Sequence, residues 1–98
     1  MTIEIKKNID EIILEIDGRL DTITAPSLDE AINEYIGNTK NLILDFKKLQ
    51  YISSAGLRVL LGAQKKIQKN ATMKVKNVNP EIMEVFEMTG FVDILEIE

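Results

Sequence analysis

The 98-residue sequence contains no cysteine and no histidine, and these absences exclude several kinds of chemistry. Without cysteine there is no disulfide, no thiolate metal site and no thiol nucleophile. Without histidine the chain lacks the commonest general base and the commonest transition-metal ligand. No apolar run approaches the roughly 20 residues of a membrane helix, and no secretory signal opens the chain. We therefore expect a cytoplasmic protein with one domain over residues 1–98, no cofactor and no metal.

Positive charge is also scarce. Twelve Lys and Arg residues stand against 16 Asp and Glu residues, which gives a formal net charge of −4. The cations are scattered, so the chain has no basic patch of the kind that neutralises phosphates in nucleic-acid binding. Hydrophobic residues make up 45% of the chain, an ordinary fraction for a globular protein. No large apolar excess is present, and this favours a monomer.

The first part of the chain predicts a β-hairpin followed by a helix. Residues 2–7 and 12–16 have strand patterns, with a turn at residues 8–10 and an interruption at Gly18. A helix should begin at Thr24-Ala25-Pro26, since proline is favoured in a first turn, and end at Gly37.

The remaining patterns alternate between strands and helices. Strands are predicted at residues 42–46 and 73–75, the latter extending at most to Val78. A helix begins at Ser53 or Ser54 and fades at residues 69–70, and another opens at Asn79-Pro80-Glu81 and closes at Gly90. Residues 91–97 add a short edge strand. The order predicts an α/β fold with a mixed sheet of four to five strands and three to four helices.

The junction Tyr51-Ile52-Ser53-Ser54-Ala55-Gly56-Leu57-Arg58 is the most informative stretch. It leads from a strand pattern into an amphipathic helix, and its central residues are all small. One stripe that we expect to be buried follows at helical spacing, made of Leu57, Leu60, Leu61, Gln64 and Ile67. The two serines therefore lie where a helix begins, beside free backbone N–H groups and the positive end of the helix dipole. A phosphate placed there would be stabilised by the helix itself.

These small residues have a structural interpretation and a functional one. A serine at this point is a favoured N-cap, worth about 1 kcal/mol, and Ala55 and Gly56 could be small because the helix packs close to the sheet. However, glycine in a first turn costs roughly 0.5–1 kcal/mol relative to alanine. We therefore expect an exposed rim at which a partner protein approaches the backbone. Arg58 lies one turn after Ser54 and could face a phosphate on it.

The chain resembles the STAS domain, which sulfate-transporter tails share with anti-sigma-factor antagonists. The resemblance rests on the Tyr-Ile-Ser-Ser-Ala-Gly-Leu-Arg core and on the Gly-Arg-Leu-Asp-Thr-Ile-Thr-Ala segment from Gly18 to Ala25. It continues through the opening hairpin, the leucine-rich helix and the strand-to-helix step from Asn77 to Gly90. It implies a STAS fold over nearly the whole chain.

The resemblance also implies a function. In this family a serine two positions before the Gly-Leu pair is phosphorylated by a partner that is both a serine kinase and an anti-sigma factor, which points to Ser54. The unphosphorylated form binds the partner and frees a sigma factor, and a phosphatase resets the switch. Many members have an aspartate where this chain has Ser53, so Ser53 is the alternative acceptor. The expected partner contacts are Asp21, Thr22, Ser53, Ala55, Gly56, Leu57 and Arg58.

Other functions remain as alternatives. Some STAS domains work as scaffolds or sensors that bind other proteins or a nucleotide without phosphorylation. A serine hydrolase using Ser54 would need Lys65 or Lys66 as its base, since the chain has no histidine. Asp45 at the end of a strand could be catalytic, but an aspartate there more often bonds loop amides. We expect a binding protein and not an enzyme.

Overall fold

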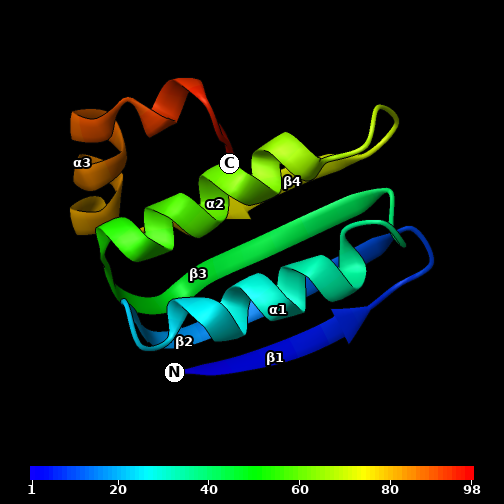
Figure 1. Ribbon diagram of the computed structural model, residues 1–98, viewed down its shortest axis with the longest axis horizontal. Coiled ribbons are helices and arrows are strands. Elements are labelled where there is room, and N and C mark those ends of the chain that lie inside the picture. Colours follow the sequence, from blue (N-terminus) through cyan, green and yellow to red (C-terminus); the bar gives the residue numbers. More distant parts are fainter.

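The computed structural model describes residues 1–98 and shows a five-stranded sheet in the order β1-β2-β3-β4-β5 (Figure 1). Strand β1 is antiparallel to β2, and every other neighbouring pair is parallel. The predicted α/β fold with a mixed sheet and an opening hairpin is confirmed. The elements are β1 (Thr2–Lys7), β2 (Glu11–Leu20), α1 (Ala25–Tyr35), β3 (Asn41–Ile52), α2 (Ser54–Lys66), β4 (Thr72–Lys76), α3 (Pro80–Thr89), the 3-10 turn η1 (Phe91–Asp93) and β5 (Glu96–Ile97).

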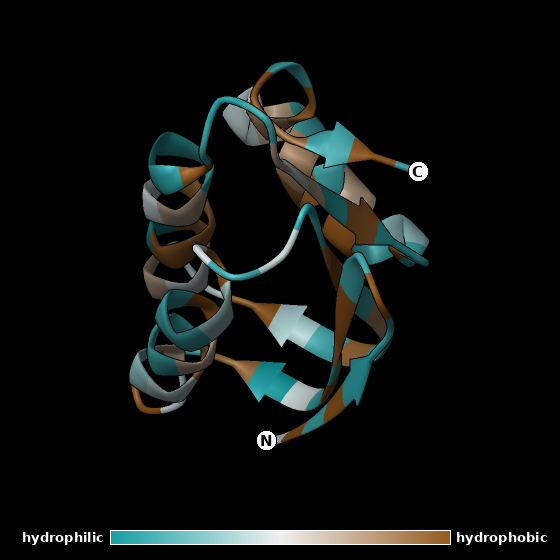
Figure 2. Cartoon of the chain, turned by 90° about the vertical axis from the view of Figure 1, so that its right-hand side faces the viewer, coloured by the Kyte–Doolittle hydropathy of each residue, from teal (hydrophilic) through white to brown (hydrophobic).

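Helices α1 and α2 lie on one face of the sheet (Figure 2). Each connects two neighbouring parallel strands, and right-handed crossovers that advance in one direction place both helices on the same side. The core between the layers contains alternate residues of the two central strands, namely Ile12, Leu14, Ile16, Leu42, Leu44 and Phe46. The other face carries charged side chains, among them the ion pair of Lys6 and Glu15 at 3.0 Å.

Helix α3 joins the same core through its aromatic residue. The ring of Phe86 packs against Phe46 at 6.5 Å between centroids and against Phe91 at 6.4 Å. The predicted boundaries are confirmed, because Asn79 is the N-cap and Gly90 takes a left-handed conformation with φ +80°. The edge strand expected over residues 91–97 is shorter than predicted, since η1 occupies the first three positions.

The two central strands are longer than the sequence pattern predicts. Strand β2 passes through Gly18, at φ +112°, and ends at Leu20 rather than at residue 16. Strand β3 continues from residue 46 to Ile52, because Leu49 and Ile52 also reach the core. Register shifts between the two strands accommodate these changes of pattern. As a result, both strands run up to the start of α2. Helix α2 in turn ends at Lys66, earlier than the predicted end at residues 69–70.

Candidate functional site

Helix α2 begins directly after β3, at the predicted junction of small residues. Ser53 is extended, with φ −99° and ψ 177°, and the helix runs from Ser54. The buried stripe of α2 consists of Gly56, Leu57, Leu60 and Ala63. Because this stripe faces the sheet, Ser54 and Arg58 remain exposed, one helical turn apart on the outer side.

The start of α2 is fixed to the end of β2. The backbone N–H of Ser53 donates to the carbonyl of Leu20 at 2.9 Å, and the Ser53 carbonyl accepts from the N–H of Leu57 at 3.0 Å. Gly56 packs on the sheet so closely that a Cβ there would lie 2.7 Å from Leu20 Cγ and 2.8 Å from Ile52 Cγ1. The position of Ser54 is therefore set by direct contact of the helix backbone with two buried side chains.

This packing corrects the expected role of Gly56. The sequence predicted an exposed rim at Gly56, but the residue is buried, and Leu57 is only 8% exposed. The prediction of exposure is wrong for Gly56 because it lies on the face of α2 that contacts the sheet. Leu57 lies on the same face and is buried, as its place in the predicted buried stripe requires. The structural interpretation, a small residue where the helix packs close to the sheet, is confirmed for Gly56. Ala55 is half-buried at the edge of this contact.

The two serines differ in access. Ser53 occupies the N-cap position as predicted, but its side chain makes no capping hydrogen bond. Its Oγ atom is buried and has no hydrogen-bond partner, so the expected cap bond is absent. Ser54, the next residue, is exposed. Of the two candidate acceptors, Ser54 is therefore the more exposed to solvent.

The turn between β2 and α1 lies beside this junction and is closed by side-chain hydrogen bonds. Asp21 Oδ1 accepts from the N–H groups of Ile23 at 3.0 Å and Thr24 at 3.1 Å. Thr24 Oγ1 lies 2.7 Å from the carbonyl of Arg19, to which it donates, and accepts from the N–H of Asp21 at 2.9 Å. The hydrogen bond from the Thr24 N–H, aided by that from Ile23, lowers the pKa of Asp21 below its ordinary value of 3.8. Asp21, expected as a partner contact, thus also holds the turn together.

A shallow groove between the starts of α1 and α2 brings predicted residues together. It is lined by Thr22, Ala25, Pro26, Asp29, Ala55, Arg58 and Val59. Three of these are predicted partner contacts, and they come from segments more than 30 residues apart in the sequence. Arg58 makes no ion pair within the chain, so its charge remains available.

Two features of this end of the molecule were not predicted. The side chain of Ile23 is 87% exposed in the turn before α1. The guanidinium of Arg19 lies over the ring of Tyr51, 4.2 Å from its centroid. Ile23 had a signal in the sequence, since it is an apolar residue between two threonines in a polar turn. The contact between Arg19 and Tyr51 had no signal in the sequence, because it depends on the register of β2 and β3.

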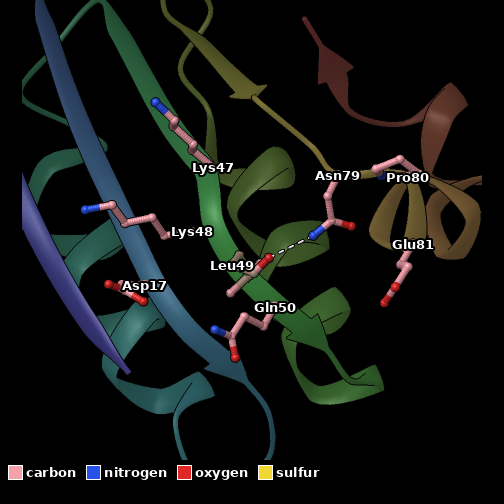
Figure 3. Close-up of a pocket in the computed structure, with 8 residues that line it drawn as sticks. All are labelled: Asp17, Lys47, Lys48, Leu49, Gln50, Asn79, Pro80 and Glu81. Atoms are coloured by element: carbon pink, nitrogen blue, oxygen red, sulfur yellow. Dashed lines mark hydrogen bonds between the residues drawn. The ribbon is translucent and has the colours of Figure 1, made fainter.

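A second hollow lies between β3 and the start of α3 and contains none of the predicted residues. Its lining is Asp17, Lys47, Lys48, Leu49, Gln50, Asn79, Pro80 and Glu81. In Figure 3 the two lysines extend away from Asn79, whose amide donates to the carbonyl of Leu49 at 2.9 Å. The polar groups do not converge on one point, and Asn79 joins α3 to the sheet.

The remaining candidates have structural roles. Asp45 Oδ1 accepts from the Lys47 N–H at 2.9 Å and from the Asn77 side-chain amide at 3.0 Å, so Asp45 bonds amide groups as expected. It does so from within β3, which continues to Ile52, and not from the end of a strand. No group of three or more Asp or Glu side chains is arranged to hold a metal ion. None of the helices has the length and apolar character that a membrane crossing requires.

Comparison with known proteins identifies related chains. The family model described as STAS domain matches residues 1–98. The anti-sigma-B factor antagonist of Listeria monocytogenes serovar 1/2a is 33% identical over 101 residues, which cover 100% of this chain and 89% of that protein.

Solved structures show the same fold. An anti-sigma factor antagonist from Mycobacterium paratuberculosis matches with a TM-score of 0.90 and 22% identity, over 98% of this chain and 83% of that one. The Bacillus cell fate determinant SpoIIAA in its phosphorylated form matches with a TM-score of 0.75 and 18% identity, over 99% and 91% of the two chains.

Proposed function

The chain belongs to the STAS domain family, and we propose that it acts as an anti-sigma-factor antagonist. In this proposal the unphosphorylated protein binds an anti-sigma factor that is also a serine kinase, and so releases a sigma factor. Phosphorylation of Ser54 abolishes this binding, and a phosphatase restores it. The protein acts as a cytoplasmic monomer, by binding rather than by catalysis. The name of the Listeria relative supports the antagonist role.

The observation that carries the proposal is the contrast between the two adjacent serines. A kinase must bring the acceptor hydroxyl into line with the terminal phosphate of ATP. Ser54 is exposed at the first position of α2, whereas the Oγ atom of Ser53 is buried. Phosphorylation of Ser53 would require its hydroxyl group to leave this buried position. Ser54 is therefore the acceptor in the proposal.

The fold tolerates a phosphate at Ser54. The first turn of α2 contains no acidic residue, and its N–H groups receive no side-chain cap. A phosphate there adds about −1.5 to −2 charges at neutral pH, next to the positive end of the helix dipole. Arg58, one turn away and without an ion pair, adds a second favourable interaction. The match with phosphorylated SpoIIAA is a precedent for a phosphate on this fold.

The same charge would prevent binding to the partner. A surface that buries a neutral serine offers the phosphate neither water nor counter-charge, and this mismatch costs several kcal/mol. Because Ser54 is exposed in the free protein, the cost arises only in the complex. Phosphorylation should therefore abolish binding and leave the stability of the free protein nearly unchanged.

Two alternatives are less well supported. A serine hydrolase would need a lysine near Ser54, but Lys65 and Lys66 are in the last turn of α2, about 16–18 Å from Ser54 along the helix axis. Lys66 also donates to Asn33 Oδ1 at 3.0 Å. A scaffold or sensor that binds proteins or a nucleotide without phosphorylation is the second alternative, and no observation on the chain favours it over the switch.

Phosphate mapping by mass spectrometry tests the proposal. The protein is incubated with ATP and the purified anti-sigma-factor kinase of the same organism, and its peptides are then mapped. We expect one phosphate on Ser54 in the wild type and in Ser53→Ala, and none in Ser54→Ala. Ser53→Ala is a matched control because it removes the neighbouring hydroxyl only.

Binding measurements complete the test. The same kinase should bind the wild type and Ser54→Ala with comparable Kd values and should not bind Ser54→Asp. Equal affinity for the wild type and Ser54→Asp would refute the switch. A phosphate on Ser53 alone would move the acceptor, and binding without any phosphate would support the scaffold alternative.

A further inference from the structure

The turn before α1 presents an isoleucine to solvent. Ile23 is 87% exposed and belongs neither to the apolar core nor to the residues packed on it. The three other residues of this turn, Asp21, Thr22 and Thr24, are polar. Burying an isoleucine is favourable because it removes apolar surface from water. The fold gains nothing of this kind from Ile23, so the side chain is free to be buried by a partner.

The backbone beneath Ile23 is held in one conformation. The N–H of Ile23 donates to Asp21 Oδ1 at 3.0 Å, and the N–H of Ala25 donates to the Asp21 carbonyl at 2.8 Å. Thr24 Oγ1 joins the turn to the end of β2 through the carbonyl of Arg19. A partner that buries Ile23 therefore does not have to order this turn, and preorganisation of this kind favours affinity.

The charges around Ile23 indicate the chemistry of the partner surface. The chain carries a net charge of −4, yet both of its arginines, Arg19 and Arg58, lie at the end of the sheet that bears Ile23 and Ser54. Neither arginine forms an ion pair. Arg58 lines the groove together with Thr22, the neighbour of Ile23. Asp29 is the one carboxylate in the lining of this groove. Arginine is enriched among the residues that dominate the binding energy of interfaces, and both arginines lie at the end of the molecule that bears the exposed Ile23.

We propose that Ile23 is the apolar anchor of the surface that binds the anti-sigma factor, and that it enters an apolar pocket bordered by carboxylates that face Arg19 and Arg58. This inference rests on the proposed function and names the residue and the partner chemistry that determine affinity. It also explains how the switch acts at the interface. A phosphate on Ser54 would neutralise the positive charge of Arg58 within the chain, and it would repel the carboxylates that border the partner's pocket.

The test compares two exposed isoleucines at opposite ends of β2. Ile9, in the turn between β1 and β2, is 99% exposed and serves as the matched control. The Kd for the purified anti-sigma-factor kinase is measured for the wild type, Ile23→Ser, Ile23→Leu and Ile9→Ser. We expect Ile23→Ser to bind about 10- to 100-fold more weakly, the change that loss of a buried isoleucine predicts. Ile9→Ser should bind like the wild type, and Ile23→Leu within about threefold of it, since volume is kept.

The outcomes separate this inference from the proposed function. If Ile23→Ser binds like the wild type while Ser54→Asp does not bind, the anchor is refuted and the switch stands. Equal losses for Ile23→Ser and Ile9→Ser would also refute the anchor, because the effect would not be local. If the wild type itself does not bind the kinase, the proposed function fails and the anchor fails with it. Circular dichroism should give the same Tm for every variant, since both isoleucines are exposed.

Discussion

Helices α2 and α3 both begin at a polar N-cap residue, but their first turns are built differently. At the start of α3, Asn79 Oδ1 accepts from the N–H of Ile82 at 2.9 Å, and the same side chain donates to the Leu49 carbonyl. Glu81 adds an acidic residue to that first turn, where the helix dipole favours it. At the start of α2, Ser53 provides no side-chain bond and no acidic residue follows.

This difference separates a helix start that serves the fold from one that is available for function. In the first turn of α3 the N–H of Ile82 is capped by Asn79, and the same side chain joins this turn to β3. The first turn of α2 is held instead on the side that faces the sheet. Gly56 packs against Leu20 and Ile52, and the Ser53 N–H donates to the Leu20 carbonyl. The solvent-facing side of this turn, which includes Ser54, receives no side-chain cap from the rest of the chain. A group added there meets free N–H groups and does not displace a native interaction.

The largest expected effect concerns the glycine that holds α2 on the sheet. Gly56→Ala places a methyl group within 3 Å of buried carbons of Leu20 and Ile52, so the helix start must shift. We expect a destabilisation of about 1–3 kcal/mol, as for other overpacked sites, together with weaker binding of the anti-sigma factor. Urea unfolding measures the first effect and titration with the kinase measures the second.

Gly62, in the same helix, is the matched control for Gly56. A Cβ at Gly62 would have no atom within 4 Å. Gly62→Ala should therefore stabilise the protein by about 0.5–1 kcal/mol through helix propensity. If the two substitutions change stability by the same amount, the close contact at Gly56 does not determine the position of α2.

The next effect compares the two N-caps directly. Asn79→Ala removes the cap of α3 and leaves the Leu49 carbonyl without its donor, so we expect a loss of about 1 kcal/mol. Ser53→Ala removes a buried hydroxyl that has no partner, and the change should stay within about 0.5 kcal/mol. Both values come from urea unfolding. A cost for Ser53→Ala as large as that for Asn79→Ala would mean that Ser53 does cap α2.

The same comparison shows what sequence alone could predict. Both helix starts were placed correctly, because proline, glycine and N-cap residues act over a few residues. The role of Gly56 was predicted incorrectly, since it depends on Leu20, a residue 36 positions earlier that reaches α2 only because β2 continues through Gly18. A sequence pattern does not reveal that a strand passes a glycine with positive φ and shifts its register.

The candidate site was predicted to a similar degree. The placement of Ser54 and Arg58 one turn apart at the start of α2 was predicted from local spacing, whereas the Asp21 turn was expected from the family resemblance. The burial of the Ser53 hydroxyl and the stacking of Arg19 on Tyr51 were not, since both depend on how β2 and β3 pair. The contrast between Ser53 and Ser54 became visible only with that pairing, although the residues are adjacent in the sequence.

The smallest expected effect is a pH response that distinguishes the start of α2 from the turn before α1. Asp21 accepts backbone N–H bonds as a carboxylate, so its folded pKa lies below the ordinary value of 3.8. A lowered pKa means that the contribution of Asp21 to stability is present above pH 3.8 and is lost as the pH falls through the folded value. The start of α2 has no such group, because neither Ser53 nor Ser54 titrates.

In an NMR titration from pH 7 downward, the amide signals of Ile23 and Thr24 should move below pH 3.8, while that of Ala55 stays in place. Asp21→Asn should abolish the movement. A midpoint at or above 3.8 for Ile23 and Thr24 would show that these hydrogen bonds do not favour the ionised carboxylate.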